Sequence, residues 1–299
     1  MPAAIESFEN FPGQNKEITD YLLRIMQLQL NGKQYRAVPF NPFDAMKSYQ
    51  RLVKGGVEDP KLSLLGFQMN FVFNDFEAAR LLLFEAAKRG HQGGQSTMDN
   101  LRIVTGKWRR ELRLRKADAE SNVPRVKIEL DVGEIVVELF EDHAPNTVAN
   151  FISLVESGFY DGLSFTQVSV SEVAVAGSPT TDGRGGPGYA IKDECEGENI
   201  RNHFTGVISM FPLRKDAGGS RFLITKKPQP SLDNKVTAFG RVVEGMENVY
   251  KIQIVDQSRG IVPNSPLPTE IKKMTVLSKR DHEYKLEKIA APPAGSTGR

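Results

Sequence analysis

The spacing of apolar residues changes abruptly near residues 119–124, and this change constrains the fold more than any other feature of the sequence. Before it, apolar residues recur at helical intervals; after it, short runs such as VKIEL and EIVVELF alternate with Gly, Pro and Asp. A period of about 3.6 residues is typical of amphipathic helices and a period of 2 of strands. The sequence therefore predicts an α+β multidomain protein, with an α-helical domain over residues 1–122, a strand-rich domain over 123–281 and a largely disordered tail over 282–299.

The helical part contains one segment with the residue pattern of a helical hairpin. Turn signals at Asn31-Gly32, Gly55-Gly56, Asp59-Pro60 and residues 90–94 predict about five helices before residue 122. Within them, DPKLSLLGFQMNFVFNDFEAARLLLFEAAKRG resembles a tetratricopeptide repeat (TPR), in which small residues let two helices approach closely. A single copy leaves two interpretations open: a site for a partner protein, or helices that pack only on each other and on the second domain.

Composition excludes several classes of protein. The net charge is +2, with 39 Lys and Arg against 37 Asp and Glu, so composition demands neither nucleic acid nor an anionic membrane. A basic stretch at 107–116 fits either an RNA contact or a solvated helix end, and we expect the latter. The single cysteine, Cys195, excludes a disulfide framework, and the histidines lack ligand spacing, so we expect no metal and no cofactor.

The sequence also bears on location. No stretch approaches the roughly 18 apolar residues of a membrane span, and the start MPAAIESFEN lacks the features of a signal peptide. We therefore expect a cytoplasmic protein as the sequence stands, or an exported one if a leader was removed.

Five blocks of the second half, in a fixed order, are similar to one known family. They are GEIVVELFEDHAPNTVANFISLVESGFYDGLSF, GRGGPGY, HFTGVISM, GGSRFLIT and LDNKVTAFGRVVEGMENVYKI. Over about residues 125–280 the chain resembles the cyclophilin family of peptidyl-prolyl cis-trans isomerases (rotamases). The resemblance implies an eight-stranded closed β-barrel, capped by helices at 146–157 and 247–254. Substrate would then bind outside the barrel, because inward residues fill it; these are Val136, Phe151, Ile208, Phe222 and Phe239.

A glycine pattern in the second block also invites a nucleotide-binding interpretation. Gly183, Gly185 and Gly188 have the spacing G-x-G-x-x-G, but a strand-like YAIKDE follows them in place of a helix. Without a helix N-terminus to hold a pyrophosphate, we expect no nucleotide.

The family's site is largely replaced in this chain. Active cyclophilins carry F-H-R-V-x-x-x-F-M-x-Q-G-G-D where this chain reads FTQVSVSEVAVAGS, without a gap. The family's arginine becomes Gln167, its Phe-Met pair becomes Glu172-Val173, and its glutamine becomes Val175.

Two further blocks show similar losses. In GVISMFPLRKDAGGSRFLIT, a small residue and an asparagine become Phe211-Pro212, a glutamine becomes Arg221, and a phenylalanine becomes Leu223. The family's W-L-D-G-K-H reads SLDNKV, so Ser231 replaces the tryptophan, which argues against cyclosporin binding. The resemblance thus implies catalytic roles at Gln167 and, as a compensating cation, Arg221. It implies substrate-binding roles at Val173, Val175, Phe211, Phe222, Leu223, Leu232 and Val236.

The chemistry of the reaction indicates what these changes cost. Rotation about an Xaa-Pro bond crosses a barrier of about 18–20 kcal/mol that arises from amide resonance. In the family, an arginine donates hydrogen bonds to the proline carbonyl and nitrogen, which stabilises the twisted amide without covalent chemistry. Gln167 keeps an N–H donor but loses the charge and the fork.

Two functions stay open on this sequence. One is a cyclophilin-type isomerase of divergent site, with low or narrow activity, that assists protein folding. The other is a catalytically inactive peptide-binding module of a chaperone or scaffold, with a degenerate active site. Proline-containing or extended peptides and proteins are the expected partners in both cases.

Overall fold

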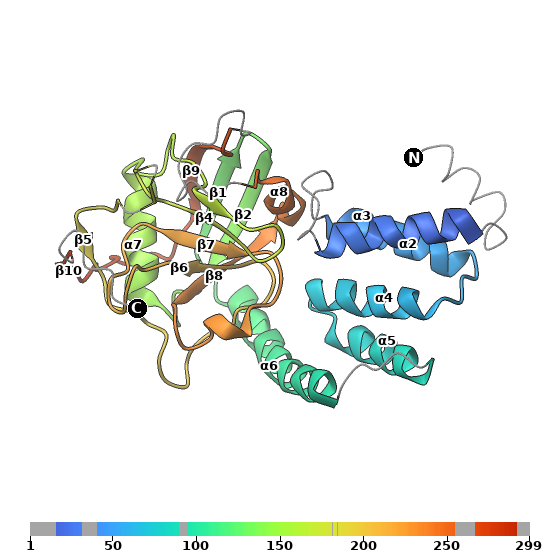
Figure 1. Cartoon of the computed structure of the whole chain (residues 1–299). Helices are drawn as coiled ribbons and strands as arrows, with labels where there is room; N and C mark the ends of the chain where they lie inside the picture. The colour runs from blue at the N-terminus through green and yellow to red at the C-terminus, as the bar shows by residue number, and fades with distance from the viewer. Residues whose placement is uncertain are drawn as a thin grey trace. The chain divides into compact units, whose positions relative to one another are not determined.

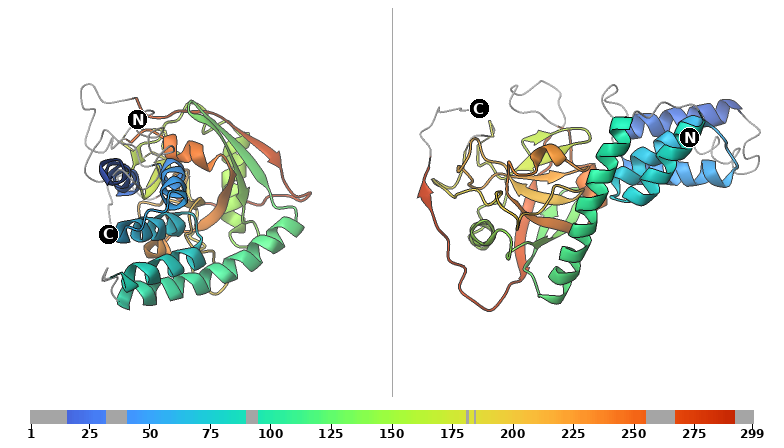
Figure 2. Two further views of the ribbon diagram at one scale, coloured as in Figure 1. Left: turned by 90° about the vertical axis from the view of Figure 1, so that its right-hand side faces the viewer. Right: turned by 90° about the horizontal axis from the view of Figure 1, so that it is seen from below.

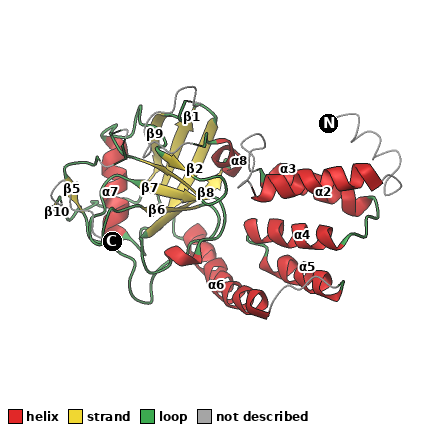
Figure 3. Ribbon diagram, in the orientation of Figure 1, coloured by secondary structure: helices red, strands yellow, loops and turns green. Residues whose placement is uncertain are grey.

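The computed structural model of the 299-residue chain describes residues 16–31, 41–89, 95–180, 182–183, 185–254 and 267–291. The chain divides into two compact units, Met1–Arg109 and Arg110–Arg299. Helices make up the described part of the first unit, and the strands belong to the second (Figure 3). The predicted change from helix to strand is therefore present, with strand β1 beginning at Arg125.

The described part of the first unit is built from helices, three of which begin at capping side chains. They are α2 (Lys16–Asn31), α3 (Pro42–Lys54), α4 (Pro60–Val72), α5 (Phe76–Lys88) and the start of α6 (Gln95–Glu120) (Figure 1). The side chains of Asn41, Asp59 and Asp75 accept backbone N–H groups at the starts of α3, α4 and α5. Such caps satisfy donors that have no partner within the helix.

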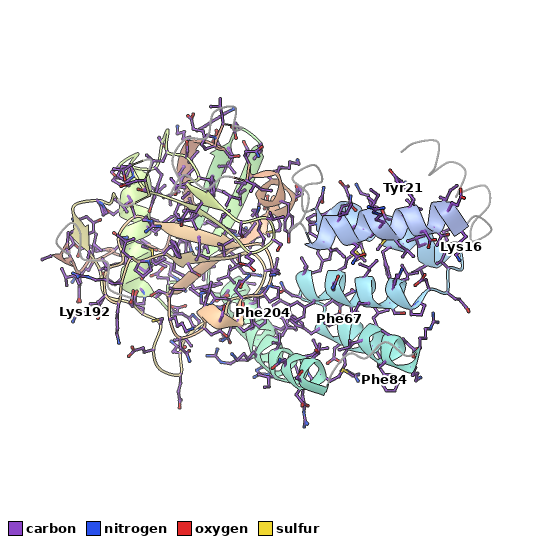
Figure 4. The ribbon with its side chains drawn as sticks, viewed as in Figure 1. Lys16, Tyr21, Phe67, Phe84, Lys192 and Phe204 are labelled. Carbon is purple, nitrogen blue, oxygen red and sulfur yellow. The ribbon has the colours of Figure 1, made fainter. Side chains whose placement is uncertain are left out.

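Helices α4 and α5 form the hairpin that the sequence predicts. They pack on one another across a turn at Asn74, whose φ is +62°. Gly66 on α4 has no room for a side chain, because a Cβ there would lie 2.7 Å from the ring of Tyr49. Likeness to a tetratricopeptide repeat stays a prediction, as does a partner site on this unit. Figure 4 labels Phe84 on α5, which is 49% exposed, with the Lys88 ammonium 4.6 Å from its ring centre.

Helix α6 contributes residues to both units. In the first, Arg109 binds Glu77 at 2.6 Å. In the second, Arg110 donates to two backbone carbonyls, at Ile200 and Glu198. These two cations of the basic stretch are therefore engaged within the protein, and they lie in the middle of α6, not at its end.

The end of α6 holds a buried ion cluster in the second unit. The Arg201 guanidinium donates to Glu111 at 2.8 Å and to Asp118 at 2.9 Å, and all three residues are buried. Burial opposes the charge of Glu111, but hydrogen bonds from Arg201 and Arg115 outweigh it and lower the pKa of this carboxyl below its ordinary value. The second unit therefore includes α6 from residue 110, whereas the predicted domain begins at 123.

The second unit is a curled eight-stranded sheet. Its strands are β1 (Arg125–Leu130), β2 (Gly133–Leu139), β3 (Gln167–Val168), β4 (Val173–Ala176), β6 (Val207–Met210), β7 (Phe222–Thr225), β8 (Ala238–Glu244) and β9 (Ile271–Ser278). They are hydrogen-bonded in the order β3-β4-β7-β6-β8-β2-β1-β9, and each pairing is antiparallel.

The prediction of a closed barrel is wrong. β3 and β9, the end strands, are not paired with each other, so the sheet is a half-barrel. Their edges meet at an isolated bridge, Ser164↔Glu270, where the Phe165 N–H donates to the Thr269 carbonyl. The hydrogen bonds across this edge come from residues before β3, because the Gly162 N–H donates to the Ile271 carbonyl and the Ile271 N–H donates to the Leu163 carbonyl.

Two helices accompany the sheet, as the resemblance implies. Helices α7 (Pro145–Glu156) and α8 (Met246–Lys251) lie on opposite sides of the strands (Figure 1). The interior contains most of the predicted core residues: Phe151, Ile208, Phe222 and Phe239. The prediction that Val136 points inward is wrong, because Val136 is only half-buried and its neighbours Ile135 and Val137 point inward.

Helix α7 is capped by a residue distant in the sequence. Its N-terminal residue Ala144 has no capping side chain, and the Glu194 carboxylate accepts the N–H groups of Asn146 and Thr147 instead. A carboxylate at this end also interacts favourably with the helix dipole.

The tail is ordered further than the sequence predicts. After β9 the chain follows the outside of the second unit to β10 (Ile289–Ala290), which pairs with β5 (Tyr189–Ala190) (Figure 2). Tyr284 donates to Glu141 on the way, at 2.9 Å. Residues 282–291 therefore differ from the predicted disorder, and residues 292–299 lie outside the described part of the chain.

Candidate functional site

One row of paired residues crosses the outer face of the sheet. Gln167 on β3 pairs with Val175 on β4, and Val175 pairs with Leu223 on β7. Residues opposite one another in an antiparallel ladder place their side chains on the same face. The adjacent residues Ala174 and Phe222 belong to the interior cluster, so the row faces outward.

Ser209 on β6 completes this row, because it pairs with Leu223. We call Gln167, Val175, Leu223 and Ser209 the outer row. Ser209 is fully buried, and its Oγ has no hydrogen-bond partner among the described residues. The row thus brings the predicted catalytic position, Gln167, and two predicted binding positions together.

Arg221 lies on the same face, one step beyond the outer row. It comes two residues before Leu223, and alternate residues of an extended chain share a face. Its guanidinium lies over the ring of Phe211, 4.8 Å from the centre, and the Phe211 N–H donates to its carbonyl. The predicted compensating cation and one predicted binding residue are therefore in direct contact.

The backbone beside Arg221 requires a glycine on the neighbouring segment. Gly177 has a φ of +89°, and a Cβ on it would lie 2.2 Å from the carbonyl oxygen of Ser220. The Ser220 hydroxyl in turn donates to the Gly177 carbonyl at 2.6 Å. This close approach fixes the chain directly before Arg221.

Burial removes most of the Arg221 side chain from water. It is 8% exposed, and no described atom accepts a hydrogen bond from its Nε or Nη1. Burial lowers the pKa of Arg221 below its ordinary value, while the carboxylate of Asp182 acts in the opposite direction. An arginine stays charged under such conditions, so the face carries a buried cation.

The remaining predicted binding residues fall into two groups. Val173 and Leu232 are half-buried, Val173 on β4 and Leu232 at the end of a short 3-10 helix, η1 (Pro230–Leu232). Val175, Leu223 and Val236 expose only 1%, 1% and 2% of their surface. They therefore present almost no apolar surface to a ligand in this conformation.

Phe222 points away from the outer row. It is fully buried in the interior cluster, where its ring packs on Phe151 and Tyr160. Alternation along β7 accounts for this direction, and the substrate-binding role at Phe222 stays a prediction.

Sequence reasoning did not single out a buried lysine near the site. Lys226 follows β7 and is 1% exposed, and its Nζ donates to the Ser169 carbonyl at 3.2 Å. Burial lowers the pKa of this ammonium to about 8. The contact anchors the turn between β3 and β4, which carries the exposed Glu172. The neighbouring Lys227, by contrast, is partly exposed and lies 3.8 Å from Glu172. Two consecutive lysines in the sequence do not indicate which of them is buried.

The described residues contain no group of three His, Cys, Asp or Glu side chains placed to hold a metal ion. Across the described ranges, no helix has the length and apolarity needed to cross a membrane.

The eight antiparallel strands and the two helices agree with what the resemblance to cyclophilins implies, whereas the open edge of the sheet does not. The profile of the family described as "Cyclophilin type peptidyl-prolyl cis-trans isomerase/CLD" matches residues 125–276, about half of the chain. The chain belongs to this family.

Curated relatives agree with this assignment. The chain is 48% identical over 117 residues to peptidyl-prolyl cis-trans isomerase B of Bacillus subtilis, a match that covers 39% of this chain and 81% of the relative. It is 39% identical over 142 residues to a peptidyl-prolyl cis-trans isomerase of Helicobacter pylori, covering 47% of this chain and 86% of the relative.

Among solved structures, a cyclophilin type peptidyl-prolyl cis-trans isomerase of Cryptosporidium parvum, crystallised in the presence of the dipeptide Ala-Pro, is also similar. The identity is 26% and the TM-score 0.44, and the match covers 52% of this chain and 99% of that chain.

Proposed function

We propose that this chain is a peptidyl-prolyl cis-trans isomerase of divergent site, with low or narrow activity on Xaa-Pro bonds, that assists protein folding. The observation that supports this proposal best is the outer row. It presents the Gln167 amide on the outer face of the sheet, in one row with Val175 and Leu223. By the resemblance, Gln167 stands at the position of the family's arginine.

The Gln167 side chain retains part of the chemistry needed. Its amide N–H groups are donors to a proline carbonyl or to a pyramidal proline nitrogen. A neutral donor is about half as strong as a charged one, and loss of one preorganised donor typically costs about 10² to 10³ in rate. We therefore infer a rate enhancement well below that of a site with arginine at this position.

Arg221 is a candidate to compensate in part. It is a buried cation on the same face as the outer row, and its Nε and Nη1 have no acceptor among the described residues. A guanidinium in such a place would act on a substrate carbonyl more strongly than in water.

A second candidate function is peptide binding without turnover. It is favoured by the burial of Val175, Leu223 and Val236, which expose 1%, 1% and 2% of their surface and so offer little room for a proline ring. A protein of this kind would hold extended segments of a partner and leave their isomer unchanged.

Exchange NMR spectroscopy on a panel of blocked Xaa-Pro peptides separates these functions, because shifts report binding and cis/trans cross-peaks report isomerisation. We expect weak catalysed exchange that Gln167→Ala removes and that Gln167→Arg raises by about tenfold to a hundredfold. Gln167→Glu, which keeps the shape but replaces the amide donor, is the matched control and should behave like Gln167→Ala. Shifts without exchange in the unmodified protein would favour the binding module, and neither shifts nor exchange would refute both proposals.

A further inference from the structure

Buried hydrogen-bonding groups without protein partners gather around the outer row. Among the described residues, Thr166 Oγ1, Ser209 Oγ and both Nε and Nη1 of Arg221 are buried and have no hydrogen-bond partner. Thr166 directly precedes Gln167, Ser209 belongs to the row, and Arg221 lies one step beyond it. Buried polar groups are almost always satisfied in native proteins, so a cluster of unsatisfied ones at a candidate binding face needs an explanation.

The Arg221 guanidinium stacks on an aromatic ring, while its Nε and Nη1 have no hydrogen-bond acceptor among the described residues. Phe211 lies under the plane of the guanidinium, 4.8 Å from the ring centre to Cζ. This stacking fixes the orientation of the group but accepts none of its N–H bonds. The two unsatisfied nitrogens lie on different edges, each shared with Nη2: Nε and Nη2 form one edge that can bind a carboxylate in a bidentate manner, and Nη1 and Nη2 form the other.

Two of the unsatisfied residues converge on one point. A Cβ built on Gly183 would lie 3.5 Å from Thr166 Oγ1 and 3.9 Å from Arg221 Nη2. Gly183 has no side chain there, so a hydroxyl and a guanidinium nitrogen face the same small space. A hydroxyl can donate to an anion that the guanidinium also binds.

Among the described residues, no acidic group accepts a hydrogen bond from Nε or Nη1 of Arg221. Asp182 is the acid whose field acts on Arg221, and its Oδ1 accepts the Thr180 hydroxyl at 2.6 Å. Glu172, on the turn between β3 and β4, is exposed and faces Lys227 at 3.8 Å.

We propose that Arg221, with the Thr166 hydroxyl as a second donor, binds a carboxylate of the peptide that this face receives, supplied by an acidic side chain or by the peptide's C-terminus. This inference rests on the proposed function, since both the isomerase and the binding module take peptides, and it assigns their substrate class: acidic proline-containing segments. The carboxylate supplies the acceptors that the buried guanidinium lacks, which is why an acidic peptide binds more tightly than a neutral one.

The test measures affinity by NMR titration of the full chain with matched peptides. One pair of blocked, amidated Xaa-Pro peptides carries Glu or Gln at each position flanking the proline. A second pair, with Gln, ends in a free carboxylate or an amide. We expect the Glu peptide or the free acid to bind about tenfold or more tightly than its neutral partner. Which pair shows the preference identifies the source of the carboxylate.

Two variants locate the effect. Arg221→Met should abolish the preference while keeping the methyl NMR spectrum of the folded protein. Lys227→Met, which removes a neighbouring cation paired with Glu172, should keep it. Asp182→Asn should increase the preference, because Asp182 acts on the same guanidinium.

The outcomes are distinguishable. Equal affinity for charged and neutral peptides would overturn this inference and leave the proposed function intact. A preference that survives Arg221→Met and disappears in Lys227→Met would also overturn it. Absence of binding by every peptide would refute the proposed function itself.

Discussion

The buried ammonium of Lys226 predicts a specific dependence of stability on pH. Its pKa falls from 10.5 to about 8 because burial penalises the charged form. At about 1.4 kcal/mol for each pKa unit, this fall corresponds to about 3 kcal/mol. The pKa is lower in the folded state than in the unfolded state, so the unfolded state binds more protons between about pH 8 and 10.5. The penalty is therefore present in full below pH 8 and is relieved as the pH rises through this window.

Lys226→Met removes the charge and keeps most of the side-chain volume. The variant also loses the hydrogen bond to Ser169, which is worth about 1 kcal/mol. We expect the variant to be about 2 kcal/mol more stable than the unmodified protein at pH 7, and to lose that advantage towards pH 10. Tyr160 and Tyr250, whose pKa values burial raises, titrate in both proteins, so their effect cancels in the difference.

The assay is urea unfolding at pH 7, 8, 9 and 10, followed through the methyl NMR signals of interior isoleucines such as Ile128 and Ile224, which report on the second unit alone. Lys227→Met is the matched control, because its side chain is 32% exposed, and we expect a change below about 0.5 kcal/mol at pH 7. A stability difference between Lys226→Met and the unmodified protein that is equal at pH 7 and pH 10 would refute the reasoning.

Two further predictions concern carboxylates of the second unit. Arg201→Met removes the cation that the buried carboxylates of Glu111 and Asp118 share and leaves Glu111 with Arg115 alone, and we expect a loss of about 3–5 kcal/mol in the same unfolding assay; a loss below 1 kcal/mol would contradict the role of this cluster. Glu194→Ala removes the acceptor at the start of α7 and should cost about 1–2 kcal/mol, whereas Glu196→Ala, at an exposed pair with Lys215, should cost almost nothing.

Much of the fold follows from local pattern. The change of period near residue 120 predicts helices before strands, and the gapless correspondence of residues 165–178 with the family places Gln167 and Val175 on paired strands. These features depend on residues close together in the chain, which is why sequence alone determines them.

Orientation within β2 shows where local pattern is insufficient. Ile135, Val136 and Val137 are all apolar, so alternation does not say which of them points inward. The structure turns Ile135 and Val137 inward, and a register shift between Val136 and Val137 adjusts the pairing with β8. Phe222 and Leu223 present the same ambiguity, since they are adjacent apolar residues whose side chains lie on opposite faces.

Long-range contacts account for most of what sequence did not predict. The partners Glu111 and Arg201 are separated by 90 residues, and nothing near either residue indicates the other. The unsatisfied groups of Thr166, Ser209 and Arg221 likewise become visible only when three separate segments are brought together.

The position of α6 determines where this protein can be cut. Consider a fragment that starts at residue 123, where the apolar spacing changes from helical to strand-like. It would keep Arg201 but lose α6 and, with it, both carboxylates that pair with Arg201. Such a fragment would leave Arg201 without its ion-pair partners and uncover the surface that α6 buries, so failure to express it would say nothing about whether the second unit folds by itself. A fragment that retains the helix from residue 110 onward, or earlier, preserves the neutral cluster and is the smallest piece on which an excision experiment is informative.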